Sequence, residues 1–365
     1  MAANDNKESM QSLSMTFKPS DLAIYLEGIA NYTFKAISEG NRPPLPVFIW
    51  GPPGVGKSDI VRQVGEKLKA KVIDIRVPLL DPTDIRGLPV ADMVNHTAEW
   101  LPPAFLPNAD RDGDKIILFL DELSAAPPTV QASCYQLVLD RKVGEYTLPK
   151  NVVIIAAGNR KSDRAISHTM SSALMSRFTH CELTTDFKDW SYWAIKNKTA
   201  PEIIAFLKDA ETLFDYDPAK DDPRAFPSPR TWAAASALYK AGFEDQILKK
   251  ALSGAVGQAA ANKFMGWLKI KDRMPNIDAI LAGEPIKVDK QDIAYVTVYT
   301  LSVRATEKTL DNVWKWSLQF DEYPEIAVLL AKTLEQGRKD LDPLNTKKYP
   351  KFSEWLNKFL KHFTY

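Results

Sequence analysis

The run GPPGVGKS at residues 51–58 constrains this chain more than any other feature of its sequence. It follows the apolar run VFIW at 47–50 and precedes residues 59–69, whose apolar side chains repeat at helical spacing, so it lies between a predicted strand and a predicted helix. In that position a glycine-rich turn points successive backbone N–H groups at a phosphate, and the helix N-terminus adds partial positive charge. A glycine-rich turn without a function would not be expected between a strand and a helix in this way. The sequence therefore predicts a phosphate-binding loop.

The positions of this loop have separate predicted parts in binding a nucleoside triphosphate. Lys57 would reach the β- and γ-phosphates, and the Ser58 hydroxyl would coordinate Mg²⁺. The backbone would surround the phosphates. The loop residues expected to contact the nucleotide are Gly51, Pro52, Pro53, Gly54, Val55, Gly56, Lys57 and Ser58.

Two carboxylates follow a second apolar run, IILFL at 116–120. This run has no polar alternation, which is typical of a strand buried on both faces of a parallel sheet, and ligands bind at the carboxyl edge of such sheets. Asp121 would support the Mg²⁺ ion beside Ser58, and Glu122 would polarise a water for attack on the γ-phosphate. An acidic pair after a strand is also a common helix cap. The phosphate-binding loop upstream favours the catalytic interpretation.

A third apolar run, NVVIIAAG at 151–158, ends in Asn159. At the end of a parallel strand this side chain would orient the attacking water or sense the γ-phosphate, whereas in isolation it would be an ordinary turn asparagine. With KVIDIR at 71–76 these runs alternate with helical segments, a pattern that predicts an α/β fold with a parallel sheet covered by helices.

The organisation of the whole chain follows from these patterns. Its 365 residues suggest two or three domains. We expect a flexible N-terminus over 1–15, an αβα nucleotide-binding core over 16–187, a helical lid over 188–272 and a helical segment over 273–365. The core would begin with a helix at 20–40, with Ser20 as its N-cap and Gly40 at its end. Residues 77–107 are long for a loop and are interpreted as a functional insertion.

Composition excludes several functional classes. Forty-seven Lys and Arg against 46 Asp and Glu produce no overall field that would attract nucleic acid or an anionic membrane. Two cysteines cannot form a disulfide framework or a structural zinc site, which favours a reducing compartment, and we expect a cytoplasmic protein. No apolar run approaches the length of a membrane span.

The aromatic residues permit two interpretations. Tryptophans could form stacking platforms for single-stranded nucleic acid, but their helical spacing favours packing. These residues are Trp190, Trp193, Trp232 and Trp267. The last 20 residues predict a docked helix with a basic solvated face, and a helix that binds a partner or nucleic acid is the alternative.

Taken in order, the motifs resemble those of the AAA+ ATPases, and specifically of the MoxR family, which is related to the magnesium chelatase ATPase subunits. The resemblance rests on the loop at 51–58, the strand and acidic pair at 116–122, Asn159, the run SSALMSRF at 171–178 and the run FPSPRTW at 226–232. It implies a Mg²⁺-dependent ATPase that forms a ring, most often a hexamer. It also implies chaperone-like remodelling with a partner that contains a von Willebrand factor A domain.

The resemblance gives roles to two arginines and two insertions. Arg177 would be the arginine finger for the ATP of a neighbouring subunit, and Arg230 would contact the γ-phosphate of its own subunit. Arg160 and Arg164 are rival fingers, because the run before Arg177 departs from the usual family pattern. The insertion at 77–107 and a hairpin at 140–151 would face a pore or partner. The alternative function is a motor on nucleic acid or a restriction-type NTPase.

Overall fold

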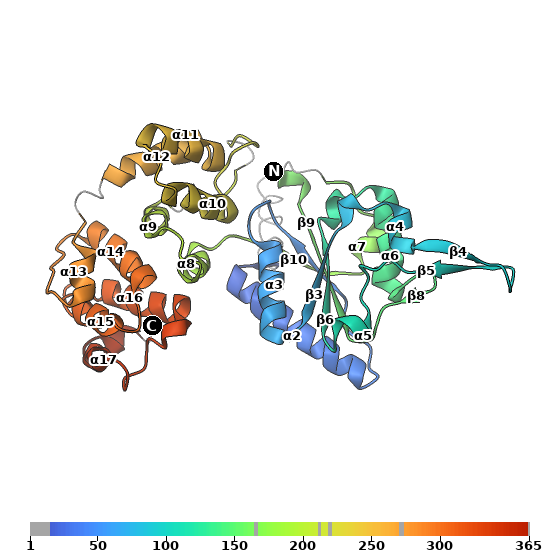
Figure 1. The fold of residues 1–365 in the computed structure, drawn as a ribbon, viewed down its shortest axis with the longest axis horizontal. Coiled ribbons are helices and arrows are strands. Elements are labelled where there is room, and N and C mark those ends of the chain that lie inside the picture. The colour runs from blue at the N-terminus through green and yellow to red at the C-terminus, as the bar shows by residue number, and fades with distance from the viewer. Residues whose placement is uncertain (1–14, 164–166, 211–212, 218–220, 270–273, 364–365) are drawn as a thin grey trace, which may run out of the picture. The chain divides into compact units, whose positions relative to one another are not determined.

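The computed structural model describes residues 15–163, 167–210, 213–217, 221–269 and 274–363. The chain divides between Thr184 and Thr185 into two compact units, which are described separately (Figure 1). Of the N-terminus expected to be flexible, residues 1–14 lie outside the described part.

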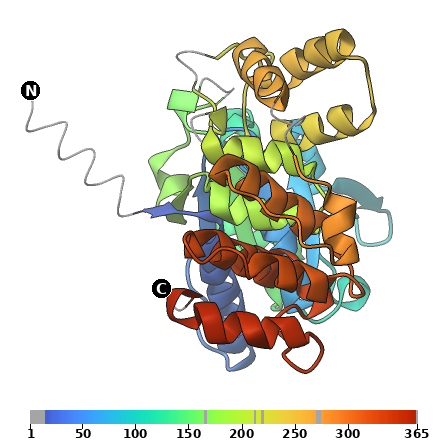
Figure 2. The same cartoon turned by 90° about the vertical axis from the view of Figure 1, so that its left-hand side faces the viewer.

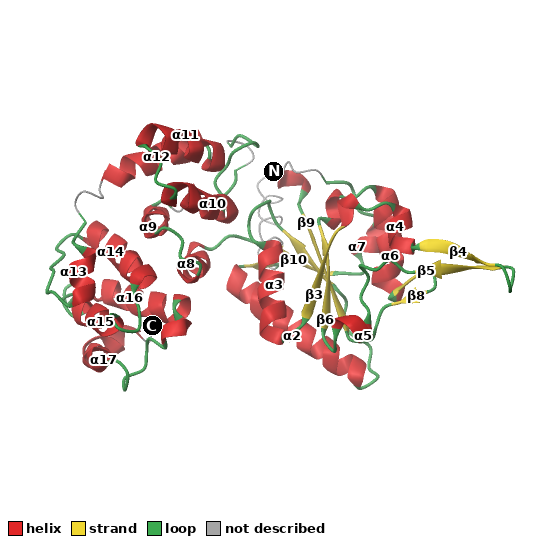
Figure 3. Cartoon of the chain, viewed as in Figure 1, coloured by secondary structure: helices red, strands yellow, loops and turns green. Residues whose placement is uncertain are grey.

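A parallel sheet of six strands forms the centre of the first unit (Figure 3). In spatial order the strands are β1 (Thr16–Phe17), β10 (Thr179–Leu183), β2 (Val47–Trp50), β9 (Val152–Gly158), β6 (Ile116–Asp121) and β3 (Lys71–Arg76). Four of them match the expected runs within one residue. Because all six are parallel, their carboxyl ends lie at one edge and their amino ends at the other.

Helices cover both faces of this sheet, as the uninterrupted apolar strands require. On one face α2 (Pro19–Ser38) and α3 (Lys57–Leu68) pack on Ile49, Phe119 and Ile155. On the other face α6 (Pro128–Asp140) packs on Phe48, Leu118 and Ile154. The αβα arrangement expected from the sequence is therefore confirmed.

The first helix begins differently from the expectation. Ser20 was expected to be its N-cap, but α2 starts at Pro19 and its N-cap is Lys18, which has no side-chain capping bond. Proline at the first helical position explains the shift, because its fixed φ suits a helix and it has no N–H to leave unpaired. The helix ends at Ser38, just before the turn at Gly40.

The expected insertion contains regular structure. Within 77–107 lie the short helix α4 (Pro82–Arg86) and an antiparallel hairpin of β4 (Leu88–Asp92) and β5 (Thr97–Leu101), which extends away from the sheet (Figure 1). A much smaller hairpin, β7 (Lys142–Val143) with β8 (Tyr146–Thr147), occupies the second predicted position. The short helices α5 (Ala109–Asp112) and α7 (Ser172–Met175) complete the unit.

The described residues of the second unit form helices joined by loops, and the carboxyl-terminal helix is drawn in red in Figure 2. Its α-helices are α8 (Phe187–Lys196), α9 (Pro201–Asp209), α10 (Pro229–Lys240), α11 (Asp245–Val256), α12 (Gln258–Trp267), α13 (Ile277–Ala282), α14 (Gln291–Arg304), α15 (Leu310–Ser317), α16 (Pro324–Gly337) and α17 (Pro350–Phe363).

Two hydrophobic clusters stabilise this unit. One contains buried Trp190 and Trp232, with Trp193 and Trp267 packed against it, so the tryptophans serve packing as expected. The other buries Phe352, Trp355 and Phe359 of α17, which is a docked helix. Helix α14 contributes to both clusters, and the boundary between a lid at 188–272 and a segment at 273–365 remains a proposal. In the part of the chain that the structure describes, no helix is long and apolar enough to cross a membrane.

Candidate nucleotide site

The predicted phosphate-binding loop connects β2 to α3 at the carboxyl edge of the sheet. Gly54 and Gly56 have φ values of +84° and +99°, in the left-handed region that side chains with a Cβ disfavour. The Gly51 N–H donates to the Gly158 carbonyl at 3.3 Å, which ties the start of the loop to β9. The glycines therefore set the backbone of the loop, and α3 begins at Lys57 with its N-terminus at the loop.

Lys57 joins this loop to the neighbouring strand end. Its side chain is buried, and Nζ donates to the carbonyl oxygens of Gly51 at 2.5 Å and Pro52 at 3.1 Å and to Asn159 Oδ1 at 2.8 Å. A phosphate would compete with these neutral acceptors for the ammonium group, and its negative charge would make the stronger partner. The predicted residues Lys57 and Asn159 thus meet, although 102 positions separate them.

Ser58 and Asp121 form a second pair at the same edge. The Ser58 hydroxyl donates to Asp121 Oδ2 at 2.9 Å, and Asp121 Oδ1 accepts the Glu122 N–H at 3.0 Å. Hydroxyl and carboxylate oxygens are donors that suit Mg²⁺, which usually keeps several waters and substrate phosphates as its other ligands. Within the described residues, no group of three His, Cys, Asp or Glu side chains could hold a metal. The donor atoms of Ser58 and Asp121 are of the kind that would hold a Mg²⁺ ion bound together with a nucleotide.

Glu122 adopts an unusual backbone conformation next to this pair. Its φ of +56° and ψ of +31° lie in the left-handed region, and its side chain is exposed, unlike that of Asp121. A conformation of this kind costs of order 1–3 kcal/mol and is common at functional sites. Here it turns the chain after β6, so that consecutive carboxylates have different surroundings. Asp121 is held by Ser58, and Glu122 is open to water.

Ser124 organises the other side of the site and was missed from the sequence. Its buried hydroxyl donates to the Asn159 carbonyl at 3.1 Å and accepts the Asn159 N–H at 3.0 Å. A Cβ at Gly158 would lie 2.5 Å from this oxygen, so the close approach requires glycine. A serine three residues after the strand end gave no sequence signal, because its partner lies 35 positions away.

The arginine finger candidates have different surroundings. Arg160 lies beside Asn159 at the carboxyl edge, and its guanidinium donates to Asp163 at 2.9 Å and to Glu182 at 3.4 Å. Arg164 lies outside the described residues. Arg160 is therefore tied within its own unit.

Arg177 lies at the amino edge of the sheet, because it precedes β10. In the register between β10 and β2, Thr179 faces Val47, whereas the phosphate-binding loop begins after Trp50. Strand β2 alone spans about 13 Å at ~3.3 Å per residue, so Arg177 is remote from the loop of its own chain. Together with Arg42 and Arg141 it lines a cavity of about 250 Å³. Its buried Nε has no hydrogen-bond partner in the described part of the chain.

Arg230 belongs to the second unit. It is the exposed second residue of α10, whose N-cap Ser228 accepts the Thr231 N–H at 3.2 Å. The predicted opening of a helix at this motif is confirmed. The role of Arg230 towards a nucleotide remains a proposal.

Comparison with known proteins gives a match over part of the chain. Residues 46–178 match the family model of the AAA domain of the dynein-related subfamily. The matched residues all lie within the first unit. Its six-stranded parallel sheet with flanking helices has the AAA+ P-loop NTPase fold, which is followed here by a helical segment. Lys57, Ser58, Asp121, Asn159 and Arg177 all lie within the matched residues, and Arg230 lies outside them.

Several solved structures resemble the chain at low sequence identity. A RuvB mutant from Thermotoga maritima is 17% identical with a TM-score of 0.36, and the match covers 76% of this chain and 81% of that one. A putative ATPase from Cytophaga hutchinsonii is 12% identical with a TM-score of 0.31, covering 70% and 90%. PCH-2 from C. elegans is 12% identical with a TM-score of 0.33, covering 69% and 68%.

Proposed function

We propose that this protein is a Mg²⁺-dependent ATPase. The observation that carries the proposal is the meeting of Lys57, Ser58, Asp121 and Asn159 at one sheet edge, next to the exposed carboxylate of Glu122. In an AAA domain the chemistry that these groups suit is the transfer of a phosphoryl group to water.

Each residue has a distinct part in this reaction. Lys57 would hold the β- and γ-phosphates, and Ser58 with Asp121 would hold Mg²⁺, which would neutralise charge on the phosphates. Glu122 accepts the proton of the attacking water, a task that its exposure to solvent permits. Asn159 orients that water from the strand end that lies beside Lys57.

We further propose that the active form is a ring, most simply a hexamer, in which Arg177 completes the site of a neighbouring subunit. The separation of Arg177 from its own phosphate-binding loop supports action on another molecule. The unpaired buried Nε supports it as well, because a buried donor without a partner is destabilising until a ligand satisfies it. Arg230 would act on the nucleotide of its own subunit.

We propose a polypeptide as the object of this ATPase. The hairpin of β4 and β5 exposes apolar side chains, with Leu88, Met93 and Val94 each at least 70% exposed. Such a surface is typical of contact sites for other proteins. Residues 87–110 contain no Lys or Arg, which disfavours a phosphate backbone as the ligand of the hairpin. By resemblance, a partner with a von Willebrand factor A domain would assist.

Phosphate release with ATP and Mg²⁺ tests the ATPase proposal. The Lys57→Ala variant should lose hydrolysis and bind ATP about 10²-fold more weakly, because charge-assisted hydrogen bonds of about 1.5–3 kcal/mol are removed. Lys150→Ala, an exposed lysine outside the site, is the matched control. Equal hydrolysis by the Lys57→Ala variant would overturn the proposal.

The polypeptide proposal has its own test. An unfolded polypeptide should stimulate phosphate release by the wild-type protein. The double variant Met93→Asp, Val94→Asp should keep basal hydrolysis and lose the stimulation, because the exposed apolar contact is removed. Stimulation by DNA or RNA with steep salt dependence would instead favour the nucleic-acid motor.

A further inference from the structure

Three arginines from separate segments line the cavity at the amino edge of the sheet, which we call the arginine cavity. Arg42 lies between α2 and β2, Arg141 is the C-cap of α6, and Arg177 follows α7. The cavity has a volume of about 250 Å³. Sites for drug-sized ligands occupy about 300–1,000 Å³, so this one suits a small ion.

The segment that contains Arg42 is stiff. Pro43, Pro44 and Pro46 follow it and also line the cavity. Because proline fixes φ, few backbone conformations are open to this linker. Arg42 is exposed, and its side chain has no hydrogen bond or ion pair to any described residue. Its guanidinium is therefore available to a ligand in the cavity.

Arg141 is partly buried without a balancing charge. Its Nη2 donates to the carbonyl oxygens of Pro149 at 3.0 Å and Val152 at 2.8 Å, which hold the side chain in place. Burial lowers the pKa of its guanidinium below the ordinary value, because loss of hydration disfavours the charged form. No carboxylate among the described residues forms an ion pair with it. An anion in the cavity would stabilise the charged form.

Arg177 adds a second guanidinium without a balancing charge. Its Nε is buried and has no hydrogen-bond partner in the described part of the chain, which is destabilising until a ligand accepts that bond. Asp140 also lines the cavity, but among the described residues its exposed carboxylate forms no ion pair with the arginines. Three positive charges against one negative leave a net charge of +2.

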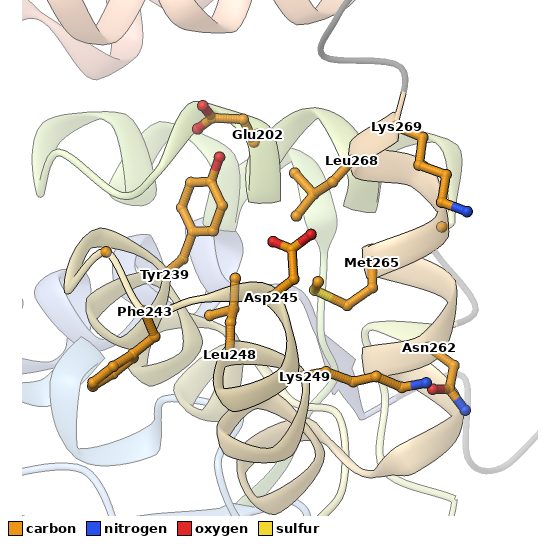
Figure 4. Close-up of a pocket in the computed structure, with 12 residues that line it drawn as sticks. Glu202, Tyr239, Phe243, Asp245, Leu248, Lys249, Asn262, Met265, Leu268 and Lys269 are labelled. Atoms are coloured by element: carbon orange, nitrogen blue, oxygen red, sulfur yellow. The ribbon is translucent and has the colours of Figure 1, made fainter.

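A larger cavity in the second unit provides a contrast. It has a volume of about 800 Å³ and is lined by residues of α9, α10, α11 and α12 (Figure 4). Its charged lining residues are Glu202, Asp245, Lys249 and Lys269. Two acids and two bases cancel, so that lining favours neither a cation nor an anion. The arginine cavity, in contrast, favours an anion.

We propose that the arginine cavity binds inorganic phosphate. A guanidinium presents paired N–H donors that match phosphate oxygens, and phosphate carries roughly one to two negative charges near neutral pH. Phosphate offers four oxygens to the three arginines, whereas a carboxylate offers two. Arg177 Nε would donate to one oxygen, and Arg42 and Arg141 would donate to others. Val138 and Val153, which are buried in the wall, would limit hydration and so strengthen these bonds.

Calorimetric titration of the full-length Lys57→Ala protein with inorganic phosphate, without nucleotide or Mg²⁺, tests the site. Lys57→Ala removes the ammonium group that would hold phosphate at the phosphate-binding loop. Phosphate should bind at least about tenfold more tightly than acetate, because acetate forms fewer charge-assisted hydrogen bonds. No binding of phosphate, or equal binding of acetate, would overturn the proposal.

Neutral variants in the same Lys57→Ala protein test the arginines. Arg42→Gln and Arg177→Gln should each weaken phosphate binding by at least about tenfold. These two are preferred to a variant of Arg141, because Arg141 also holds two backbone carbonyls. Arg86→Gln is the matched control, since Arg86 is exposed in the same unit and lies outside the cavity. Unchanged binding in both variants, or equal weakening by Arg86→Gln, would overturn the site.

A variant with the opposite sign tests the location. Asp140→Asn removes the carboxylate that lines the cavity, so it should tighten phosphate binding by about two- to fivefold, the range for an exposed charge. Asp114→Asn is the control, because Asp114 is exposed in the same unit and does not line the cavity. Binding no tighter in Asp140→Asn than in Asp114→Asn would overturn the location.

Bound phosphate should also inhibit ATP hydrolysis, an effect that rests on the proposed role of Arg177. Phosphate in the cavity would hold Arg177 in its own chain and keep it from a neighbouring site. In the protein with Lys57 intact, Arg42→Gln should keep the basal rate of ADP production and need at least about tenfold more phosphate for the same inhibition. Equal inhibition of Arg42→Gln and wild type would overturn this link to Arg177, whereas the titrations decide the phosphate site itself.

Discussion

The carboxyl and amino edges of the six-stranded sheet carry different polar side chains, and these differ in their hydrogen bonding. At the carboxyl edge Lys57, Asp121 and Asn159 are at most 9% exposed, and their polar groups are hydrogen-bonded to one another or to the loop. At the amino edge Arg177 lines a cavity with two other arginines, and its buried Nε is unpaired in the described residues. The polar groups at one edge are therefore hydrogen-bonded, whereas the other edge contains a buried donor with no partner among the described residues.

This difference follows from the geometry of parallel strands. The carboxyl ends of all parallel strands lie at the same edge of the sheet, so residues distant in sequence come together there. A residue that precedes a strand lies at the opposite edge, a full strand length away. We propose on this basis that the carboxyl edge binds the nucleotide of its own chain and that Arg177, at the amino edge, acts on another molecule.

The largest expected effect on ATP turnover comes from a variant that alters only the amino edge. Arg177→Ala should lower ATP turnover by about 10³-fold or more, the usual contribution of an arginine finger, and should leave ATP affinity of the isolated chain nearly unchanged. Phosphate release and a nucleotide binding titration measure the two quantities. Arg160→Ala is the comparison variant, because Arg160 is paired with Asp163 at the other edge.

Mixing variants sharpens this prediction. A Glu122→Gln subunit still presents its Arg177 to a neighbour whose own Glu122 is intact, so mixtures of Arg177→Ala and Glu122→Gln subunits should recover hydrolysis. Mixtures of Arg230→Ala and Glu122→Gln should stay inactive, because each subunit then has a defect in its own site. Inactivity of the first mixture despite verified co-assembly would contradict the role of Arg177 and leave Arg160 or Arg164 as candidates.

A second prediction concerns a variant at the carboxyl edge that should lower turnover without weakening nucleotide binding. Glu122→Gln should lower turnover by about 10²-fold, since general base catalysis contributes about 10²–10⁴-fold, and should preserve ATP binding. Glu66→Gln, an exposed glutamate on α3, controls for the change in charge. Turnover at the wild-type rate in Glu122→Gln would remove Glu122 from the mechanism.

A third prediction concerns the packing that holds the carboxyl edge together. Gly158→Ala should destabilise the protein by about 1–3 kcal/mol, because the new Cβ would overlap Ser124 Oγ and Phe48, the latter at 2.9 Å. Thermal melting measures the loss. Gly254→Ala in the open position of α11 should instead stabilise by up to about 1 kcal/mol through helix propensity. A melting temperature unchanged in Gly158→Ala would mean that Ser124 can move freely.

The smallest expected effect concerns the two layers between these edges. Burial raises the pKa of Cys134, under one face of the sheet, and of Cys181, under the other, to about 12. The neutral thiols therefore contribute stability below about pH 9, and this contribution is lost as the pH rises towards about 12. Thiol reagents at about pH 8 should react slowly with the native protein and rapidly in denaturant. Fast reaction of either thiol in the native protein would contradict its burial.

Much of the carboxyl edge was predictable from the sequence. The loop at 51–58, the strands at 47–50 and 71–76 and the positions of Asp121 and Asn159 all follow from local patterns. These patterns are local. Glycines permit a turn and apolar runs permit burial within a few residues, so short stretches of sequence reveal them. The convergence of these ends follows from the parallel arrangement.

Only the tertiary structure decided the features that depend on distant partners. Strand β10 reads THCEL, with polar residues between its buried ones, and it is a strand because it pairs with β1 and β2 on its two sides. Ser124 matters because its hydroxyl is hydrogen-bonded to the backbone of Asn159, 35 positions away. In each case the deciding contact joins residues many positions apart. Such a contact forms only when folding has brought the two segments together, so a short stretch of sequence does not reveal it.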